Sequence, residues 1–224
     1  MALESTRTLE QLSDECMTRG LSVTPSGKNG KFKKEDYIRA LRADYLVEQY
    51  GEPENVPFPL RFMLTMDCPM LCKRYAAIKK QDVQISLWKN DGKYAAEEKI
   101  DGSRSILIYD SERHEFDFFS RHNSVSDFLP ISYKDTILVH GNYRGDTSFV
   151  LDCEVISTNA NVTTKKTCTS QLNSTSAILS LDPVQSREIQ KNNPLLFVVF
   201  DCLYDGVDIR SLPWKDRHVH AEKL

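Results

Sequence analysis

The sequence predicts an α+β protein in which a small two-helix module precedes a larger, sheet-rich domain. Two observations lead to this prediction. In the first 50 residues apolar side chains recur at helical spacing, whereas from residue 59 onward several segments alternate between apolar and polar residues. The chain has 224 residues, of which 40% are hydrophobic, so it is long enough to bury a core in one medium and one small domain.

The amino-terminal module is predicted from two helical patterns joined by a basic loop. The first covers residues 8–20 and stops at Gly20, a typical helix-ending residue, and the second begins at about Lys34. A module of about 45 residues has little core of its own, so we expect it to pack against its neighbour or to be marginally stable. The side chains that define the two patterns are Leu9, Leu12, Cys16, Tyr37, Ile38, Leu41 and Tyr45.

The larger domain is predicted from five strand-like segments. They are residues 93–100, 104–109, 115–121, 149–156 and 195–203. Residues 159–193 are polar and contain one helical pattern near 184–191, so we expect a mobile excursion that returns to the sheet. The predicted organisation is therefore a helical module at 1–50, a proline-containing linker at 51–58 and a sheet-rich domain at 59–224.

Charge and cysteine content limit the function classes. The formal net charge is −3, so any attraction to nucleic acid must be local. The six cysteines are scattered, and no signal peptide or long apolar run is found, so we expect a reducing intracellular compartment and no membrane partner.

A local basic cluster surrounds the predicted helix pair and would neutralise duplex phosphates, giving affinity that depends on salt but not on sequence. A solvated basic face without a ligand is the alternative. The residues of this cluster are Lys28, Lys31, Lys33, Lys34, Arg39 and Arg42.

The segment most informative about chemistry is residues 97–104, Glu-Glu-Lys-Ile-Asp-Gly-Ser-Arg. An Asp-Gly pair commonly turns the chain between two strands, so Lys99 is predicted at the edge of a hairpin turn. Strand alternation would then direct Glu97, Lys99 and Asp101 to one side, close to Arg104. Considered by itself, this segment is also compatible with an ordinary solvated hairpin.

Five segments stand in a fixed order along the larger domain. They are Cys-Pro-Met-Leu at 68–71 with Tyr75 and Lys79, Lys-Ile-Asp-Gly-Ser-Arg at 99–104, Phe-Ser-Arg-His-Asn at 119–123, Leu-Asp-Cys-Glu-Val at 151–155, and residues 197–204 followed by Leu212, Pro213, Asp216 and Arg217. Together they resemble ATP-dependent DNA ligases, which belong to a wider group of covalent nucleotidyltransferases with RNA ligases and messenger RNA capping enzymes. The segment at 99–104 matches the nucleophile motif of the family in full. The helical module resembles a SAP domain, a DNA-binding unit, although Phe32 stands where an aliphatic residue is expected.

The resemblance implies an antiparallel-sheet nucleotidyltransferase domain, the ATP-grasp-like adenylation domain of ligases. It implies that Lys99 attacks the α-phosphate of ATP, with Mg²⁺ as cofactor, and forms a lysyl-AMP intermediate that activates the 5′-phosphate at a DNA nick. The implied roles are adenine recognition by Glu97, adenine stacking by Phe200, ribose and phosphate contacts by Arg104 and Arg121, and ribose or metal binding by Glu154.

Family members continue with a Glu-Gly strand, a Lys-x-Lys strand and an OB-fold domain, and these are not found before Leu224. We therefore expect an adenylation domain that is incomplete at its carboxyl end, a monomer with little or no nick sealing of its own. Its place would be the cytoplasm, nucleoid or nucleus, or a host cell if it is viral. Two alternatives stay open: an RNA ligase or capping-type enzyme, and a non-catalytic DNA-binding SAP protein.

Overall fold

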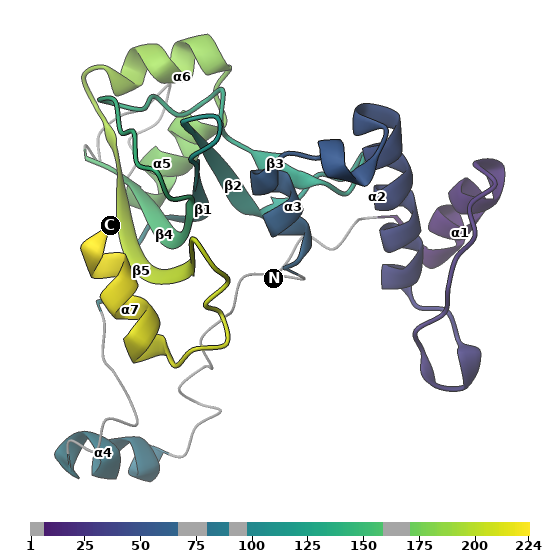
Figure 1. Cartoon of the computed structure of the whole chain (residues 1–224), viewed down its shortest axis with the longest axis horizontal. Coiled ribbons are helices and arrows are strands. Elements are labelled where there is room, and N and C mark those ends of the chain that lie inside the picture. Colours follow the sequence, from purple (N-terminus) through teal and green to yellow (C-terminus); the bar gives the residue numbers. More distant parts are fainter. Residues whose placement is uncertain (1–6, 67–79, 90–97, 159–170) are drawn as a thin grey trace.

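A five-stranded antiparallel sheet forms the centre of the protein (Figure 1). The computed structural model describes residues 7–66, 80–89, 98–158 and 171–224. The strand order is β3-β2-β1-β4-β5, so β2, β1 and β4 are flanked on both sides. The strands are β1 (Ser103–Asp110), β2 (Glu115–Asn123), β3 (Pro130–Ser132), β4 (Phe149–Ser157) and β5 (Leu195–Asp205). The predicted α+β class and antiparallel sheet are confirmed.

The helices lie around this sheet and at one end of the molecule (Figure 1). α5 packs against β4, α7 packs against the edge strand β5, and α1 packs against α2. Single 3-10 turns, η1 (Lys28–Gly30) and η2 (Pro53–Asn55), interrupt the loops before α2 and α3. The helices are α1 (Leu9–Thr18), α2 (Lys34–Tyr50), α3 (Phe58–Leu64), α4 (Lys80–Lys89), α5 (Gln171–Leu179), α6 (Pro183–Gln190) and α7 (Trp214–Lys223).

Most of the predicted elements are confirmed, and two expectations need correction. Residues 98–100 form no strand, and the rest of the predicted segment 93–100 lies outside the described residues. Residues 171–193 are not an irregular excursion, because they contain α5 as well as α6. α5 was not predicted because its buried face includes the polar residues Ser174 and Thr175, so it lacks a purely apolar helical pattern.

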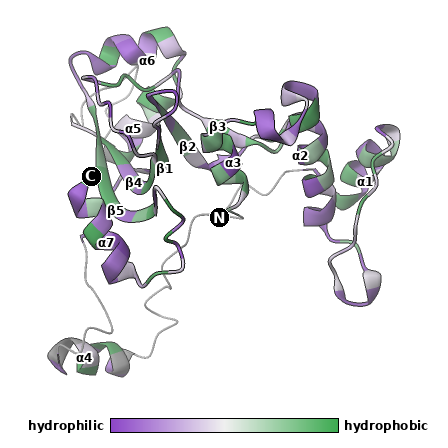
Figure 2. Cartoon of the chain, viewed as in Figure 1, coloured by the Kyte–Doolittle hydropathy of each residue, from purple (hydrophilic) through white to green (hydrophobic). Residues whose placement is uncertain are grey.

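The two faces of the sheet bury different apolar clusters. On one face, Phe62 and Met63 of α3 pack against Ile106, Ile108 and Val150. On the other, Leu179 of α5 packs with Phe118, and Tyr109, Phe149 and Cys153 form a second cluster. The strands are accordingly mostly hydrophobic, whereas α6 and α7 are more hydrophilic (Figure 2). The face that packs against α3 continues into charged residues where β1 begins.

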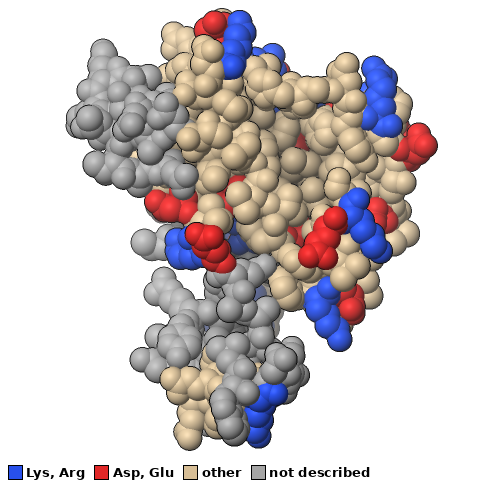
Figure 3. All heavy atoms as spheres, turned by 90° about the vertical axis from the view of Figure 1, so that its left-hand side faces the viewer, with Lys and Arg blue, Asp and Glu red and all other residues tan. Residues whose placement is uncertain are grey.

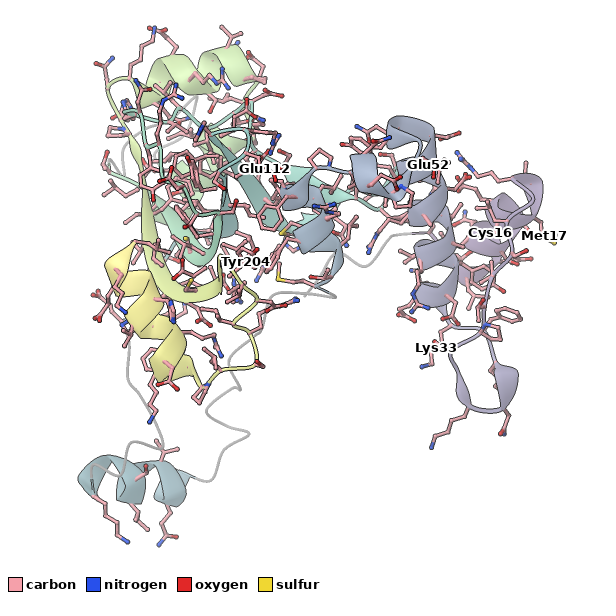
Figure 4. The ribbon with its side chains drawn as sticks, viewed as in Figure 1. Cys16, Met17, Lys33, Glu52, Glu112 and Tyr204 are labelled. Carbon is pink, nitrogen blue, oxygen red and sulfur yellow. The ribbon has the colours of Figure 1, made fainter. Side chains whose placement is uncertain are left out.

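The helical module has a small core that agrees with the predicted faces. Leu12, Cys16 and Leu41 are buried there, and Tyr37, Ile38 and Tyr45 pack around them. Cys16 points from α1 toward α2 (Figure 4). Thr8 and Gln11 form the capping box that begins α1, and Gly20, with φ +67°, turns the chain after it.

Charges of both signs are interspersed on the face drawn in Figure 3, where several Lys and Arg lie beside Asp and Glu. This distribution agrees with a formal net charge of only −3. Among the described residues, none of the helices is long and apolar enough to cross a membrane.

A buried carboxylate closes the basic loop between α1 and α2. Asp36 is 2% exposed, and its Oδ2 accepts hydrogen bonds from the backbone N–H groups of Lys33 at 2.8 Å and Ser26 at 3.0 Å. These bonds favour the ionised form and lower the pKa of Asp36 to about 2. Asp36 thereby ties the two ends of the loop that carries Lys28 and Lys31.

Replacing Asp36 by Asn should destabilise the helical module in a pH-dependent way. The pKa of Asp36 in the folded protein, about 2, lies below its ordinary value of 3.8. Its stabilisation is therefore fully present above about pH 4 and is lost as the pH falls through about 2. We expect the melting temperature of Asp36→Asn to lie below that of the wild type near neutral pH, and this gap to shrink at about pH 2.

Thermal unfolding followed by circular dichroism measures this gap. Glu35→Gln, which removes an exposed charge from the same first turn of α2, is the matched control and should show no such narrowing. A gap for Asp36→Asn that is equal at both pH values would contradict the proposed role of the charge.

Candidate active site

A buried ion pair between neighbouring strands organises the charged end of the sheet. Arg104 lies at the beginning of β1 and Asp152 in β4. Arg104 donates from Nε to Asp152 Oδ1 at 2.8 Å and from Nη2 to Oδ2. The two side chains are only 13% and 3% exposed. Such a two-point pairing fixes the position and the plane of the guanidinium.

A second buried pair lies beside the first. Asp201 of β5 is the register partner of Asp152, and Arg217 of α7 donates to it from Nε at 2.9 Å and from Nη2 at 2.7 Å. Burial raises the pKa of Asp152, and the nearby charge of Asp201 adds to this rise, whereas Arg104 opposes it. Two adjacent carboxylates are thus each compensated by one arginine.

Glu154 faces a group of cations on the same side of the sheet. It is the register partner of Arg104, so the two side chains emerge together. Burial raises the pKa of the half-buried Glu154 carboxyl, while a hydrogen bond from the Gly102 N–H and the charges of Arg104, Lys99 and Arg121 lower it. Lys99, Arg104 and Arg121, three of the predicted site residues, are therefore close enough to act electrostatically on a fourth.

Lys99 lies in an irregular segment that packs beside β4, which corrects the predicted hairpin. Residues 98–101 adopt no regular structure and Gly102 forms a bend before β1 begins. A Cβ atom at Gly102 would lie 2.3 Å from the backbone oxygen of Val155 and 2.7 Å from Ile156 Cγ2. Glycine is required by this close approach, and the Asp-Gly pair is not a solvated turn. Lys99 itself is exposed.

Phe200 lies next to these charges because of an irregularity in β5. The register between β4 and β5 shifts between Asp152 and Cys153, which leaves Phe200 as the extra residue of a bulge. Its half-buried ring lies under the guanidinium of Arg104, with Cζ 5.4 Å from the ring centroid. An aromatic face, a fixed arginine and Glu154 are thereby brought together.

This arrangement suits a ligand that combines a polyanion with an aromatic group. Lys99, Arg104 and Arg121 offer positive charge, and Phe200 offers a ring face. Within the described ranges, no group of three or more His, Cys, Asp or Glu residues could hold a metal ion by itself. Mg²⁺ is usually held by one or two carboxylates together with substrate phosphates, and Glu154 could supply one such carboxylate.

Comparison with known proteins identifies the family. The family model described as ATP dependent DNA ligase domain matches residues 69–223, which is more than half of the chain. The chain belongs to this family. A search of curated proteins finds no match. Membership implies that the protein uses ATP, acts as a nucleotidyltransferase of the ligase class and has DNA as its substrate.

Part of the ligase motif set lies outside the described residues. This applies to Glu97, the predicted adenine-recognition residue, and to Tyr75, Lys79 and the segment 68–71. The structure brings together Lys99, Arg104, Arg121 and Glu154 with Phe200, in agreement with the predicted grouping. The specific roles of these residues in the ligase stay predictions.

The predicted DNA-binding residues divide into two groups. Lys28, Lys31 and Lys33 are exposed on the loop between α1 and α2, where Figure 4 shows Lys33 at the start of α2. Arg39 is exposed as well and lies 3.8 Å from Asp36 Oδ1. Arg42 differs from these residues, because its Nε donates to the backbone oxygen of Phe128 at 2.9 Å. Its half-buried guanidinium is thus engaged inside the protein.

Lys34, the sixth residue of the basic cluster, begins α2 and is half-buried. The cluster as a whole is therefore mostly on the surface, as electrostatic binding of phosphates requires.

Sequence reasoning missed the buried partners of the site. Asp152 and Asp201 were not singled out, although an acidic residue within an apolar strand is a signal for a compensating cation. Arg217 belongs to a segment that resembles the family, but its pairing with Asp201 cannot be read from the sequence, because it depends on how α7 packs against β5.

Replacing Gly102 by Ala should weaken ATP binding by displacing the segment that carries Lys99. The added methyl group would overlap the backbone of β4, and overpacking of this kind costs about 1–3 kcal/mol. The segment must then move away from Glu154. We expect a lower melting temperature together with a large loss of ATP affinity, measured by calorimetry.

Gly141→Ala is the matched control for this substitution. Gly141 has a positive φ, +91°, which Gly102 does not have, and a Cβ at Gly141 meets no atom within 4 Å. The control should lose some stability through backbone strain and keep its ATP affinity. Equal loss of ATP affinity in both variants would show that the effect is not local to Lys99.

Proposed function

We propose that this ligase-family chain carries out self-adenylation, with Lys99 as the nucleophile. The observation that carries the proposal is the position of Lys99 in a segment packed on β4 beside Glu154, within a group of cations that includes Arg104 and Arg121. An amine that must bond to a phosphate needs both exposure to the ligand and a positive environment for the phosphate oxygens.

The proposed step transfers AMP from ATP to the lysine. The lone pair of the unprotonated Lys99 Nζ attacks the α-phosphorus and forms a phosphorus–nitrogen bond. The bond between the α-phosphorus and the bridging oxygen breaks, and pyrophosphate leaves with the electron pair. The proton that the new phosphoramidate nitrogen loses passes to solvent. The AMP would next be transferred to the 5′-phosphate at a nick in duplex DNA.

The surrounding residues would orient the nucleotide. Arg104, fixed by Asp152, and Arg121 would neutralise charge on the phosphates and contact the ribose. Glu154 would accept a hydrogen bond from a ribose hydroxyl, and Phe200 would pack against the adenine ring. A bulge residue such as Phe200 can be directed toward a ligand without disrupting the rest of the strand.

Mg²⁺ fits this site as a partner of the substrate phosphates. Glu154 would contribute a carboxylate ligand, and a divalent cation bound there would add positive charge beside the phosphates. The protein groups described above would still bind and orient the nucleotide through their own hydrogen bonds.

Replacing Lys99 by Ala should abolish the covalent adduct. Wild-type protein incubated with ATP and Mg²⁺ should gain the mass of one AMP in intact-protein mass spectrometry. Lys99→Ala should gain none, whereas Lys191→Ala, which removes an exposed lysine from the end of α6, should behave as the wild type. An adduct of equal yield on Lys99→Ala would refute the assignment of the nucleophile.

We also propose that the exposed lysines of the α1–α2 loop bind duplex DNA through its phosphates, as a SAP-like module would. The protein would act on nicked duplex as an intracellular monomer. The loop combines exposed Lys28, Lys31 and Lys33 with a conformation closed by Asp36. Such contacts release counterions, so affinity should fall steeply with salt.

Removing two of these lysines should reduce the salt dependence of DNA binding. For Lys28→Ala combined with Lys31→Ala, we expect the slope of log affinity against log salt concentration to become less steep by about 2. Fluorescence anisotropy with a nicked duplex gives this slope. The matched control combines Lys215→Ala with Lys223→Ala, two exposed lysines of α7. An unchanged slope for the first pair would exclude the loop as the phosphate-binding site.

A further inference from the structure

An aromatic side chain from the sheet completes the core of the helical module. Phe128 belongs to the loop between β2 and β3, yet it is 2% exposed and clusters with Leu12, Cys16 and Leu41 of α1 and α2. Within the part of the chain that the structure describes, the buried part of this cluster therefore consists of four residues, of which Phe128 is the only one from outside the helices. A core of this size depends strongly on one large aromatic ring.

The backbone of Phe128 is held in a conformation that phenylalanine rarely adopts. Its φ is +60°, in the left-handed region, which costs free energy for a residue with a bulky side chain. Interactions from the helical module oppose this cost. Arg42 Nε donates to the Phe128 oxygen at 2.9 Å, and the Arg7 guanidinium lies 5.5 Å from the ring centroid. The loop is therefore shaped to present Phe128 to the module.

The same loop is firmly joined to the strand that carries Arg121. Ser124 N–H donates to the Leu129 oxygen at 2.8 Å and closes the loop directly after β2. Within it, Leu129 N–H donates to Asp127 Oδ1 at 3.0 Å. A displacement of Phe128 would thus be transmitted to the end of β2, two residues beyond Arg121.

The packing around Phe128 is not continuous between the module and the sheet. A cavity of about 750 Å³ lies nearby, lined by Tyr50 of α2, Pro59 of α3, Phe119 of β2 and Leu129 of the β2–β3 loop. In Figure 1, β3 extends from the sheet toward α2. Because a cavity interrupts the interface, the insertion of Phe128 makes a large contribution to holding the module in place.

We propose that Phe128 is a positioning residue that fixes the α1–α2 loop relative to Lys99, so that one duplex is bound at both places. This inference rests on the proposed binding of duplex DNA by that loop. A fixed separation makes the second contact intramolecular and raises affinity only for duplexes long enough to reach both. If the module were attached through residues 51–57 alone, its loop would sample many distances from Lys99, and the gain in affinity for long duplexes would be lost.

Hydrogen exchange of the full chain tests the docking. In Phe128→Ala, amide protection in α1 and α2 should fall by about tenfold or more, while β1 and β4 stay within about twofold of the wild type. Phe128→Leu should restore most of the protection by refilling the core. Val125→Ala is the control, because Val125 lies in the same loop but is 42% exposed, and it should leave the amide protection of α1 and α2 unchanged. Unchanged protection of α1 and α2 in Phe128→Ala would overturn the docking.

A series of nicked duplexes of increasing length tests the positioning. The wild type should show a step in affinity at the length that spans both sites. The affinity of Phe128→Ala for short duplexes should stay within about twofold of that of the wild type, and this variant should lose the step in affinity. Phe128→Leu should keep the step. A step that persists in Phe128→Ala despite lost exchange protection overturns the positioning role.

The failure of duplex binding by the loop can be recognised separately. In that case the Lys28→Ala and Lys31→Ala variant binds every duplex as the wild type does, and no length dependence arises from the module. The proposed positioning role of Phe128 would then be refuted together with the duplex-binding proposal. The hydrogen-exchange data would still show whether Phe128 holds the helical module against the sheet.

Discussion

Compensation of two adjacent buried carboxylates is the constraint on which the proposed site depends. Asp152 and Asp201 are register partners on β4 and β5, and both are almost inaccessible to water. Leaving either one unpaired would cost about 3–5 kcal/mol, as found when one partner of a buried ion pair is removed. Arg104 and Arg217 must therefore occupy the positions they have. The pairing of Arg217 with Asp201 holds α7 against the edge strand β5, and the pairing of Arg104 with Asp152 fixes the Arg104 guanidinium beside Phe200.

This constraint explains why Arg104 can serve the site without a flexible side chain. Its two-point pairing with Asp152 removes most of its rotational freedom before any ligand binds. Lys99 and Arg121, which are exposed, keep more freedom. Glu154 balances the three cations, whose charges lower the pKa that burial of its carboxyl raises. A polyphosphate would meet one cation that is already in place and two that can adjust.

The sequence was sufficient to predict what local pattern determines, and insufficient where distant segments meet. Alternation predicted β1, β2, β4 and β5, and helical spacing predicted α1 and α2, within a few residues. The grouping of Lys99, Arg104 and Glu154 followed from their motifs. The hairpin at Lys99 was wrong, because packing of Gly102 on β4 replaced the turn that an Asp-Gly pair usually forms. Arg104 and Asp152 are 48 residues apart, so no local pattern reports their pairing.

The helical module shows the same limit of prediction from sequence, here for the residues that stabilise it. Its length predicted that it packs against a neighbour or is marginally stable, but not which residue of a neighbour would enter its core. Phe128 could be recognised only after folding, because its left-handed backbone conformation carries no signal in a residue of that type. Arg42, which the sequence groups with the predicted DNA-binding cations, donates a hydrogen bond to that strained backbone. Charge alone therefore cannot separate the cations of a small module that face a ligand from those that hold the module to its neighbour.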